Sequence, residues 1–304
     1  MTTAFMFPGQ GSQTVGMGAD WLGRSDVVKR TFEEADEALG ESLSSVILEG
    51  PIEALTRTEN TQPALLTVSV AYWRVLQAEG KAPDVVAGHS LGEYSALVAA
   101  GCLDFADAVR LTRLRGRAMQ SAVPEGVGSM AAILMARDEE SITNLCAKAA
   151  QGEVLEPAGF NTNGQTVIAG HSTAIARAVE QASDFRLRGV QLNVSAPFHC
   201  SLLAPAEAVL REGLDAVDIK PLSVPYVPNV TGAWTVDPSA EQVKNNLVEQ
   251  VSNPVRWLQT MAAMKEAGVD QWLEVGHGRT LVGFVKRFDR KANLSSFEEE
   301  KWRS

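Results

Sequence analysis

Short runs of β-forming residues alternate with longer helical patterns along this chain of 304 residues. Because parallel strands must be joined by a crossover, usually a helix, the alternation predicts an α/β fold with a mainly parallel sheet. The first strand is expected at residues 3–7, where Pro8 and Gly9 should end it in a turn. A second, buried strand is expected at residues 85–87, after a helical pattern that begins near Pro63.

The middle of the chain differs in texture from both ends. From about Gly128 to Val194 the patterns predict a small β-α-β-α-β unit. Its strands are expected at residues 129–136, 166–169 and 188–194, and its helices at residues 138–150 and 173–183. We therefore predict a discontinuous core at residues 1–126 and 196–304, with an insert at residues 127–195.

The last third of the chain resumes the alternation. The expected elements are a strand at residues 224–227, helices at 240–251 and 255–267, a strand at 271–275 and a helix from about Gly278. The polar residues 298–301 should fray, as chain ends without packing do.

The composition excludes several functional classes. A formal net charge of -10 and a pI of about 5.0 argue against binding of nucleic acids or anionic membranes, because both are negatively charged. The three cysteines lie far apart without a C-x-x-C pair, which predicts neither a disulfide framework nor a metal site. Because we find no leader and no uncharged apolar run of roughly 18 residues, we expect a protein of the reducing cytoplasm without a membrane span.

A G-x-S-x-G pattern, Gly88-His89-Ser90-Leu91-Gly92, lies between the second predicted strand and a helical pattern at residues 93–100. A serine on such a sharp strand-to-helix turn presents its hydroxyl outward, and glycines on either side avoid a backbone clash. The backbone N–H of Leu91, at the helix start, should point toward an oxyanion formed beside Ser90. We therefore predict that Ser90 is a nucleophile; the alternative is a glycine-rich turn without chemistry.

A serine nucleophile needs a base within hydrogen-bonding distance, and the chain has four histidines. His89 is next to the serine, so its side chain should diverge, and His171 fits a turn inside the insert. His199 lies at the exit of the insert, whereas His277 lies between two glycines after a late strand. From the residues alone these last two candidates are nearly equal.

Six short motifs span nearly the whole chain. They are Phe7-Pro8-Gly9-Gln10-Gly11-Ser12-Gln13, the stretch from Gly88 to Leu97, Arg115-Gly116, Phe160-Asn161 with Gly164-Gln165, Ser195-Ala196-Pro197-Phe198-His199, and Asn253-Pro254-Val255-Arg256-Trp257. No single motif is decisive, but together and in this order they resemble the malonyl-CoA:acyl-carrier-protein transacylases. The resemblance implies an α/β-hydrolase-like core, formed from both ends of the chain, and a ferredoxin-like insert.

The resemblance also implies roles for the candidate residues. Ser90 is the expected nucleophile, and His199 is the base that takes its proton and later returns one to the departing thiolate. Gln10 matches the family glutamine whose backbone N–H completes the oxyanion hole with that of Leu91. The family orients its histidine through a backbone carbonyl instead of an acidic side chain, and Gln250 matches a family position near the serine and the histidine.

Arg115 can be judged without the family. On the helix predicted for residues 104–120, its side chain points beside Ala108 and Leu111, an awkward place for a cation. Helix geometry alone slightly favours an arginine that extends its head group to solvent. The resemblance instead matches Arg115 to the family arginine that binds the malonyl carboxylate bidentately, which suits guanidinium geometry.

Three further positions bear on the pocket and its surroundings. Asn161 matches a family pocket residue, although Gly159 stands where many relatives carry asparagine. Phe198, before the histidine, resembles members that prefer malonyl over branched groups. His277 becomes a loop residue at a position where family members usually carry proline.

The implied function is transfer of a malonyl group from malonyl-CoA to acyl carrier protein, for fatty acid synthesis, with no metal or cofactor. A polyketide or other malonyl pathway stays open, as do an esterase or thioesterase and a noncatalytic scaffold. An acidic chain should repel an acidic carrier protein unless basic side chains gather near the site entrance. The candidates for that patch are Arg186, Arg188, Lys286, Arg287, Arg290 and Lys291.

Overall fold

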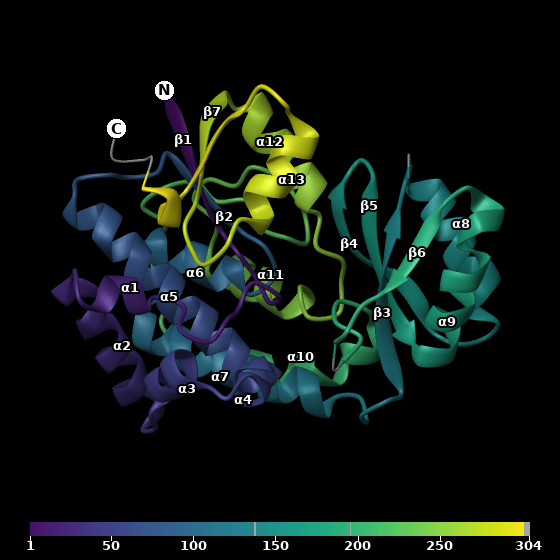
Figure 1. Cartoon of the computed structure of the whole chain (residues 1–304), viewed down its shortest axis with the longest axis horizontal. Coiled ribbons are helices and arrows are strands. Elements are labelled where there is room, and N and C mark those ends of the chain that lie inside the picture. Colours follow the sequence, from purple (N-terminus) through teal and green to yellow (C-terminus); the bar gives the residue numbers. More distant parts are fainter. Residues whose placement is uncertain (137, 195, 301–304) are drawn as a thin grey trace.

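The computed structural model describes residues 1–136, 138–194 and 196–300. Ser195, which belongs to the fifth motif and ends the predicted insert, lies outside the described residues, as do residues 301–304. Figure 1 shows two parts side by side, and each is built around its own sheet.

Sheet A belongs to the larger part, and its strand order is β2-β1-β7-β8. Neighbouring strands are parallel throughout, which confirms the predicted sheet type. The strands are β1 (Thr2–Phe7), β2 (Val85–Gly88), β7 (Val269–Glu274) and β8 (Asn293–Ser296). Both faces of the sheet are buried, because Phe5 and Phe7 of β1 enter one hydrophobic cluster while Ala4 and Met6 enter another.

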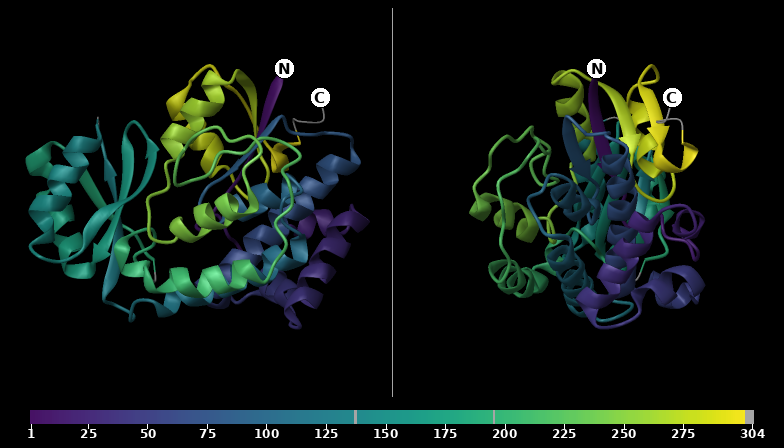
Figure 2. Two further views of the ribbon diagram at one scale, coloured as in Figure 1. Left: turned by 180° about the vertical axis from the view of Figure 1, so that it is seen from behind. Right: turned by 90° about the vertical axis from the view of Figure 1, so that its left-hand side faces the viewer.

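Helices cover both faces of sheet A (Figure 2). The cluster around Phe5 and Phe7 is completed by α1 (Ala19–Leu22), α2 (Asp26–Leu39), α3 (Leu43–Glu49), α4 (Ile52–Thr56), α5 (Thr58–Ala78), α6 (Gly92–Ala99), α7 (Phe105–Ser121), α10 (Pro205–Asp215) and α11 (Ala240–Glu249). The opposite cluster is completed by α12 (Trp257–Glu266) and α13 (Thr280–Phe288). Sheet A is therefore a central layer, as an α/β fold requires.

Sheet B forms the smaller part, and its strand order is β4-β5-β3-β6 with antiparallel neighbours. Its strands are β3 (Gly128–Leu134), β4 (Leu155–Thr162), β5 (Gln165–His171) and β6 (Arg188–Gln191). The helices α8 (Glu139–Ala150) and α9 (Ser172–Gln181), followed by the 3-10 helix η1 (Ala182–Phe185), share a hydrophobic cluster with the sheet. This β-α-β-β-α-β order is that of the ferredoxin-like motif.

The β-α-β-α-β pattern expected from the residues is therefore wrong by one strand, β4. Pro157 and Gly159 lie inside β4, and the register shifts between them. Proline lacks an N–H and is tolerated mainly on edge strands, which is where β4 lies in sheet B. Both residues break the alternation that would have revealed the strand.

Among the described residues, the strand expected at residues 224–227 is also missing. Within the described residues, the stretch 224–227 forms single bridges of Tyr226 with Val86 and Thr235, because Pro225 and Pro228 interrupt any ladder. The other predicted strands and helices are present with boundaries shifted by a few residues.

The predicted fraying of residues 298–301 is wrong for the described residues of this stretch. Glu298 lies in the 3-10 helix η3 (Phe297–Glu299) and accepts hydrogen bonds from the hydroxyl of Tyr72 at 3.0 Å and the N–H of Gly278 at 3.2 Å. Lys301 lies outside the described residues.

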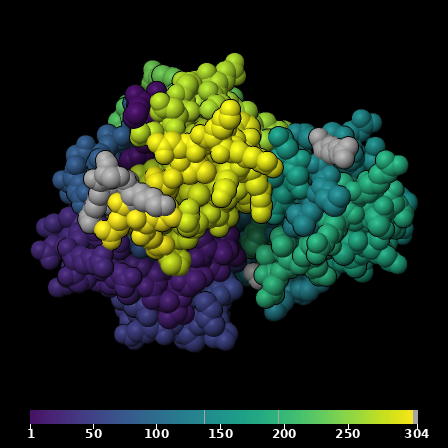
Figure 3. Space-filling model, turned by 45° about the horizontal axis from the view of Figure 1, so that its top comes forward, coloured from purple at the N-terminus to yellow at the C-terminus, as the bar shows by residue number. Residues whose placement is uncertain are grey.

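The two parts touch through the outer edge of β4. The N–H of Phe160 donates to the carbonyl oxygen of Val255 at 2.9 Å, and the N–H of Val255 donates to the carbonyl oxygen of Ala158 at 3.0 Å. Figure 3 shows the surface recessed where the parts meet. No helix of the described chain has the length and apolar character that a bilayer span requires. The predicted fold class is confirmed, whereas the boundaries 1–126, 127–195 and 196–304 stay predictions.

Candidate active site

Ser90 lies on the sharp turn between β2 and α6. Its φ of 52° is in the left-handed region that serine rarely adopts, so the surrounding structure holds the turn under strain. The flanking glycines are required by space: a Cβ on Gly88 would lie 1.9 Å from the backbone of Gly92, and one on Gly92 would lie 2.0 Å from the carbonyl oxygen of Phe7. The turn thus fixes Ser90 at the carboxyl end of β2.

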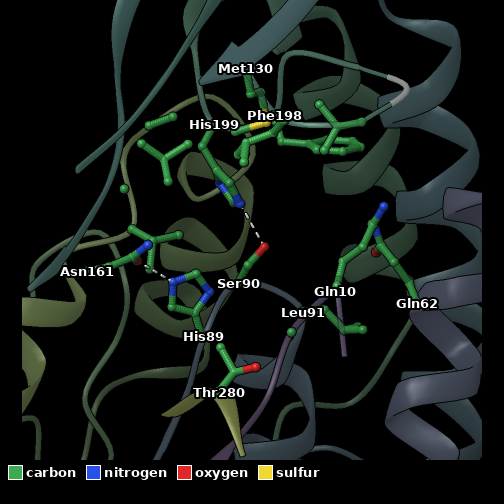
Figure 4. Close-up of a pocket in the computed structure, with 18 of the residues that line it drawn as sticks. Gln10, Gln62, His89, Ser90, Leu91, Met130, Asn161, Phe198, His199 and Thr280 are labelled. Atoms are coloured by element: carbon green, nitrogen blue, oxygen red, sulfur yellow. Dashed lines mark hydrogen bonds between the residues drawn. The ribbon is translucent and has the colours of Figure 1, made fainter. Parts of the chain in front are cut away.

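His199 lies opposite the serine, and its Nε2 is 2.7 Å from the Ser90 hydroxyl oxygen (Figure 4). Its Nδ1 is 2.7 Å from the main-chain oxygen of Gln250. Because a carbonyl oxygen can only accept, Nδ1 carries the proton, and Nε2 accepts from the serine. Burial, aided by the nearby charge of Arg115, lowers the pKa of His199 to about 3. The imidazole is therefore neutral near pH 7 and able to take a proton.

Arg115 reaches the same point from α7, with only 1% of the residue exposed. Its guanidinium donates to the side-chain oxygen of Gln62 at 2.8 Å, to that of Gln250 at 2.8 Å and to the Ser90 hydroxyl at 3.2 Å. Helix geometry alone slightly favoured a head group that extends to solvent, and that prediction is wrong. Burial lowers the pKa of Arg115, and no carboxylate among the described residues forms a salt bridge with it. A buried cation beside a reactive hydroxyl is suited to binding an anion.

Gln10 and Leu91 lie on the other side of Ser90 and line the same cavity (Figure 4). Among the described residues, the backbone N–H of neither residue donates a hydrogen bond. Leu91 immediately precedes α6, where the helix dipole is positive. Two free donors at this place can stabilise negative charge on a substrate oxygen.

A cavity of about 540 Å³ extends from these groups between the two parts of the molecule. Apolar side chains from the smaller part and the adjoining segment form one wall, among them Met130, Val167 and Phe198. Asn161 also lines the cavity, and its Oδ1 lies 2.9 Å from Nε2 of His89. The described residues contain no group of three or more His, Cys, Asp or Glu side chains placed to hold a metal ion.

The site can therefore perform acyl transfer. It combines a hydroxyl, a neutral imidazole bonded to it, two backbone donors and a buried cation within one cavity.

Comparisons with known proteins agree with this arrangement. The family model described as the acyl transferase domain matches residues 4–297. The malonyl CoA-acyl carrier protein transacylase of Escherichia coli strain K12 is 47% identical over 299 residues, which cover 97% of this chain and 96% of the relative. The chain belongs to the malonyl CoA-acyl carrier protein transacylase family. It is an acyltransferase, and the resemblance found in its motifs is confirmed.

Solved structures of the family share this fold. The malonyl CoA-acyl carrier protein transacylase of Coxiella burnetii superposes with a TM-score of 0.94 at 41% identity, over 98% of this chain and 94% of that chain. A malonyl-transacylase solved in complex with a type II polyketide synthase acyl-carrier protein superposes with a TM-score of 0.93 at 45% identity, over 97% of this chain and 96% of that chain.

The structure brings together all eight residues that the sequence predicted for the site. Those that line the cavity are Gln10, Ser90, Leu91, Arg115, Asn161, Phe198 and His199. Gln250 contacts His199 and Arg115.

His89 also lines the cavity, whereas His277 and His171 lie elsewhere, which separates the two histidines that the residues alone left nearly equal. Nε2 of His277 lies 2.7 Å from the Thr14 hydroxyl oxygen, and its Nδ1 lies 2.7 Å from Oε1 of Glu298. This loop residue thus contacts segments near both ends of the chain. His171 accepts from the N–H of Val154 at 3.0 Å and is the last residue of β5, directly before α9, so the expected turn role is wrong.

Sequence reasoning missed three polar residues at the site, Gln62, Glu93 and Asn229. Gln62 and Asn229 gave no signal, because amides are common on surfaces and in turns. Glu93 did give a signal in the sequence, since it is the only charged residue of a mainly apolar helical stretch directly after the serine motif. A charge in that position is a candidate for a buried partner of the site.

Proposed function

We propose that this protein transfers a malonyl group from malonyl-CoA to the phosphopantetheine thiol of acyl carrier protein, through a malonyl ester on Ser90, to supply fatty acid synthesis. The observation that carries the malonyl assignment is the buried guanidinium of Arg115, 3.2 Å from the Ser90 hydroxyl. A malonyl group differs from an acetyl group by a carboxylate, and a buried arginine is the group that would select for it.

In the first half-reaction, the Ser90 oxygen attacks the thioester carbonyl while Nε2 of His199 takes the hydroxyl proton. The backbone N–H groups of Gln10 and Leu91 hold the resulting oxyanion. When the carbon–sulfur bond breaks, the thiolate of coenzyme A leaves with the proton from His199. The products are free coenzyme A and a malonyl ester on Ser90.

The second half-reaction reverses these steps with a new thiol. The carrier-protein thiol gives its proton to His199, and its sulfur attacks the ester carbonyl. The Ser90 oxygen leaves and takes the proton back from His199. In both halves Arg115 holds the malonyl carboxylate, and Phe198 and Asn161 shape the space around the acyl group. The chain's own side chains account for every proton moved, so we propose no metal or cofactor.

Intact-mass measurement after mixing with malonyl-CoA tests this function. We expect one malonyl group per chain, located on Ser90 by peptide mapping, and its removal by added carrier protein bearing the phosphopantetheine thiol. The Ser90→Ala variant should stay unlabelled. Labelling of another residue would overturn the mechanism, and release into water as fast as release to the carrier would indicate a thioesterase.

A further inference from the structure

Glu93 is a carboxylate buried behind the active site, and the mechanism above gives it no task. It lies in the first turn of α6, three residues after Ser90, and 1% of the residue is exposed. Its Oε2 accepts hydrogen bonds from the N–H of Asn229 at 3.0 Å and from Nε2 of Gln250 at 2.7 Å. A buried carboxylate is costly unless it is bonded, so these contacts call for an explanation.

The contact with Gln250 decides which way its side-chain amide faces. Nε2 of Gln250 is surrounded by three acceptors: Oε2 of Glu93, the main-chain oxygen of Ser90 at 3.0 Å and Oδ1 of Asn229 at 3.4 Å. The amide oxygen must therefore point the other way, where it accepts from Nη2 of Arg115 at 2.8 Å. A flipped amide would place its NH₂ group against the guanidinium, donor against donor.

We propose that Glu93 is a positioning residue for acyl-group selectivity: it holds the amide of Gln250 so that Arg115 stays aimed at the malonyl carboxylate. This inference rests on the proposed function. The chain of contacts is continuous, from Oε2 of Glu93 to Nε2 of Gln250 and from Oε1 of Gln250 to Nη2 of Arg115.

The property that matters is the position of a hydrogen-bond acceptor, and not the negative charge. Oε1 of Glu93 has no hydrogen-bond partner among the described residues, so a proton or an NH₂ group there breaks no contact. Burial raises the pKa of Glu93 to about 7, and with the proton on Oε1 the carboxyl group still accepts through Oε2. Substitutions can therefore separate the effect of the acceptor's position from the effect of the charge.

Two variants make this separation. Glu93→Gln keeps the length of the side chain and can place its oxygen at the Oε2 position, but it removes the charge. Glu93→Asp keeps the carboxylate but withdraws it by one methylene group from Gln250. We expect Glu93→Gln to keep the ratio of malonyl to acetyl transfer within about twofold, and Glu93→Asp to lower it roughly tenfold, the size of one hydrogen bond. The opposite order would show that charge is what matters and would overturn the proposal.

The ratio is measured as the single-turnover rate of Ser90 acylation by malonyl-CoA divided by the rate with acetyl-CoA. The control is Asn246→Ala, which removes another buried polar contact, a 2.8 Å hydrogen bond to the Tyr226 hydroxyl, and should leave the ratio unchanged. In an Arg115→Ala background, Glu93→Asp should not change the ratio further. An additional change there would mean that Glu93 acts by another route.

Failure of this inference is distinguishable from failure of the proposed function. A wild-type protein without malonyl preference refutes the function itself. A wild-type preference that Glu93→Asp leaves intact refutes only the role of Glu93. If Glu93→Asp does not fold, Gln250→Ala takes its place, because it removes both the contact with Glu93 and the contact with Arg115. A Gln250→Ala protein that keeps the malonyl preference would overturn the inference equally.

Discussion

The replacement of Arg115 by alanine tests the proposed selectivity at the scale of one residue. Without the guanidinium, a malonyl carboxylate would lie unpaired in a buried site, a penalty of roughly 2–5 kcal/mol by analogy with truncated charge pairs. Malonyl transfer should fall by orders of magnitude, whereas acetyl transfer, which loses no partner, should persist or rise. The measurement is the acylation rate of Ser90 with each thioester.

Arg113 supplies the matched control for Arg115. It lies on the same helix and is also buried, but it bonds with Asn60 and Glu41 instead of the site. Arg113→Ala should cost stability and leave the malonyl preference in place. An equal fall of malonyl and acetyl transfer in folded Arg115→Ala would make that arginine structural.

His199 leads to a prediction about pH. Its pKa is lowered from 6.5 to about 3, mainly by burial and then by Arg115, so the ring stays unprotonated as the pH falls through 6.5. The rate of Ser90 acylation in the free enzyme should therefore stay level across pH 6.5 and decline only toward the lowered pKa. Rapid-quench measurement against pH checks this, and loss of half the rate near pH 6.5 would contradict it.

The same shift has a consequence for stability. Between about pH 3 and pH 6.5 the unfolded chain binds a proton at this histidine and the folded chain does not. Stability contributed by His199 is thus complete above pH 6.5 and is lost as the pH falls toward 3.

The Arg115→Ala variant lacks one of the influences that lower the pKa of His199. The acid limb of its acylation rate profile should therefore move to higher pH.

At this scale, the residues alone single out Ser90, but they identify neither the histidine opposite it nor the side chains that support the two. Ser90 is recognisable because its neighbours in the chain form a motif, whereas the choice between His199 and His277 depends on contacts far along the chain. Gln62 and Asn229 could not be predicted, because an amide becomes part of a site only through what it touches after folding. Glu93 could have been predicted, because it is a charged residue in a mainly apolar helix.

The strand, turn and helix around Ser90 lead to a prediction at the scale of the element. Gly92→Ala places a Cβ 2.0 Å from the carbonyl oxygen of Phe7, so β1 and α6 cannot keep their spacing. We expect a loss of about 3 kcal/mol or more in the free energy of unfolding, or failure to fold. Denaturant unfolding measures this loss.

Gly283 on α13 is the control for Gly92, since a Cβ there would meet nothing within 4 Å. Gly283→Ala should be neutral or stabilise by roughly 0.5–1 kcal/mol, because alanine loses less backbone entropy in a helix. Equal tolerance of both substitutions would show that the turn is not the tight element described.

Elements with one clear periodicity could be predicted from the sequence, and those with mixed signals could not. The buried apolar run of β2 and the long pattern of α5 stood out, although Pro63 lies inside that helix. β4 was missed because Pro157 and Gly159 break its alternation. The same strand carries the contacts to Val255, so the missed element is the one that joins the two parts.

At the scale of the whole molecule, the active site belongs to neither part alone. Ser90 comes from the edge of sheet A, while Met130, Val167 and Asn161 come from the strands of sheet B. The sequence predicted both units and the order of their segments. How they face each other depends on surfaces that periodicity does not describe, such as the edge of β4 against Val255.

The route of the carrier protein to this site gives the last prediction. The chain carries a net charge of -10, so an acidic carrier protein is repelled overall and needs a local basic surface. Of the candidates, Lys286 and Arg287 are exposed on α13, the helix whose first residues, Thr280 and Leu281, line the cavity. The Arg287 guanidinium also reaches Gln165 of sheet B at 3.4 Å, so this pair lies where the two parts meet.

Reversing both charges, Lys286→Glu with Arg287→Glu, should slow malonyl transfer to the carrier protein by roughly 10- to 100-fold at low salt, and less as salt screens the surface. Acylation of Ser90 by malonyl-CoA should be nearly unchanged, because the two side chains do not line the cavity. The control reverses the same charge on α2, with Lys29→Glu and Arg30→Glu, so that the net charge changes equally. If both half-reactions slow together, or the α2 control slows carrier transfer as much, the effect comes from net charge or folding and α13 is not the docking site.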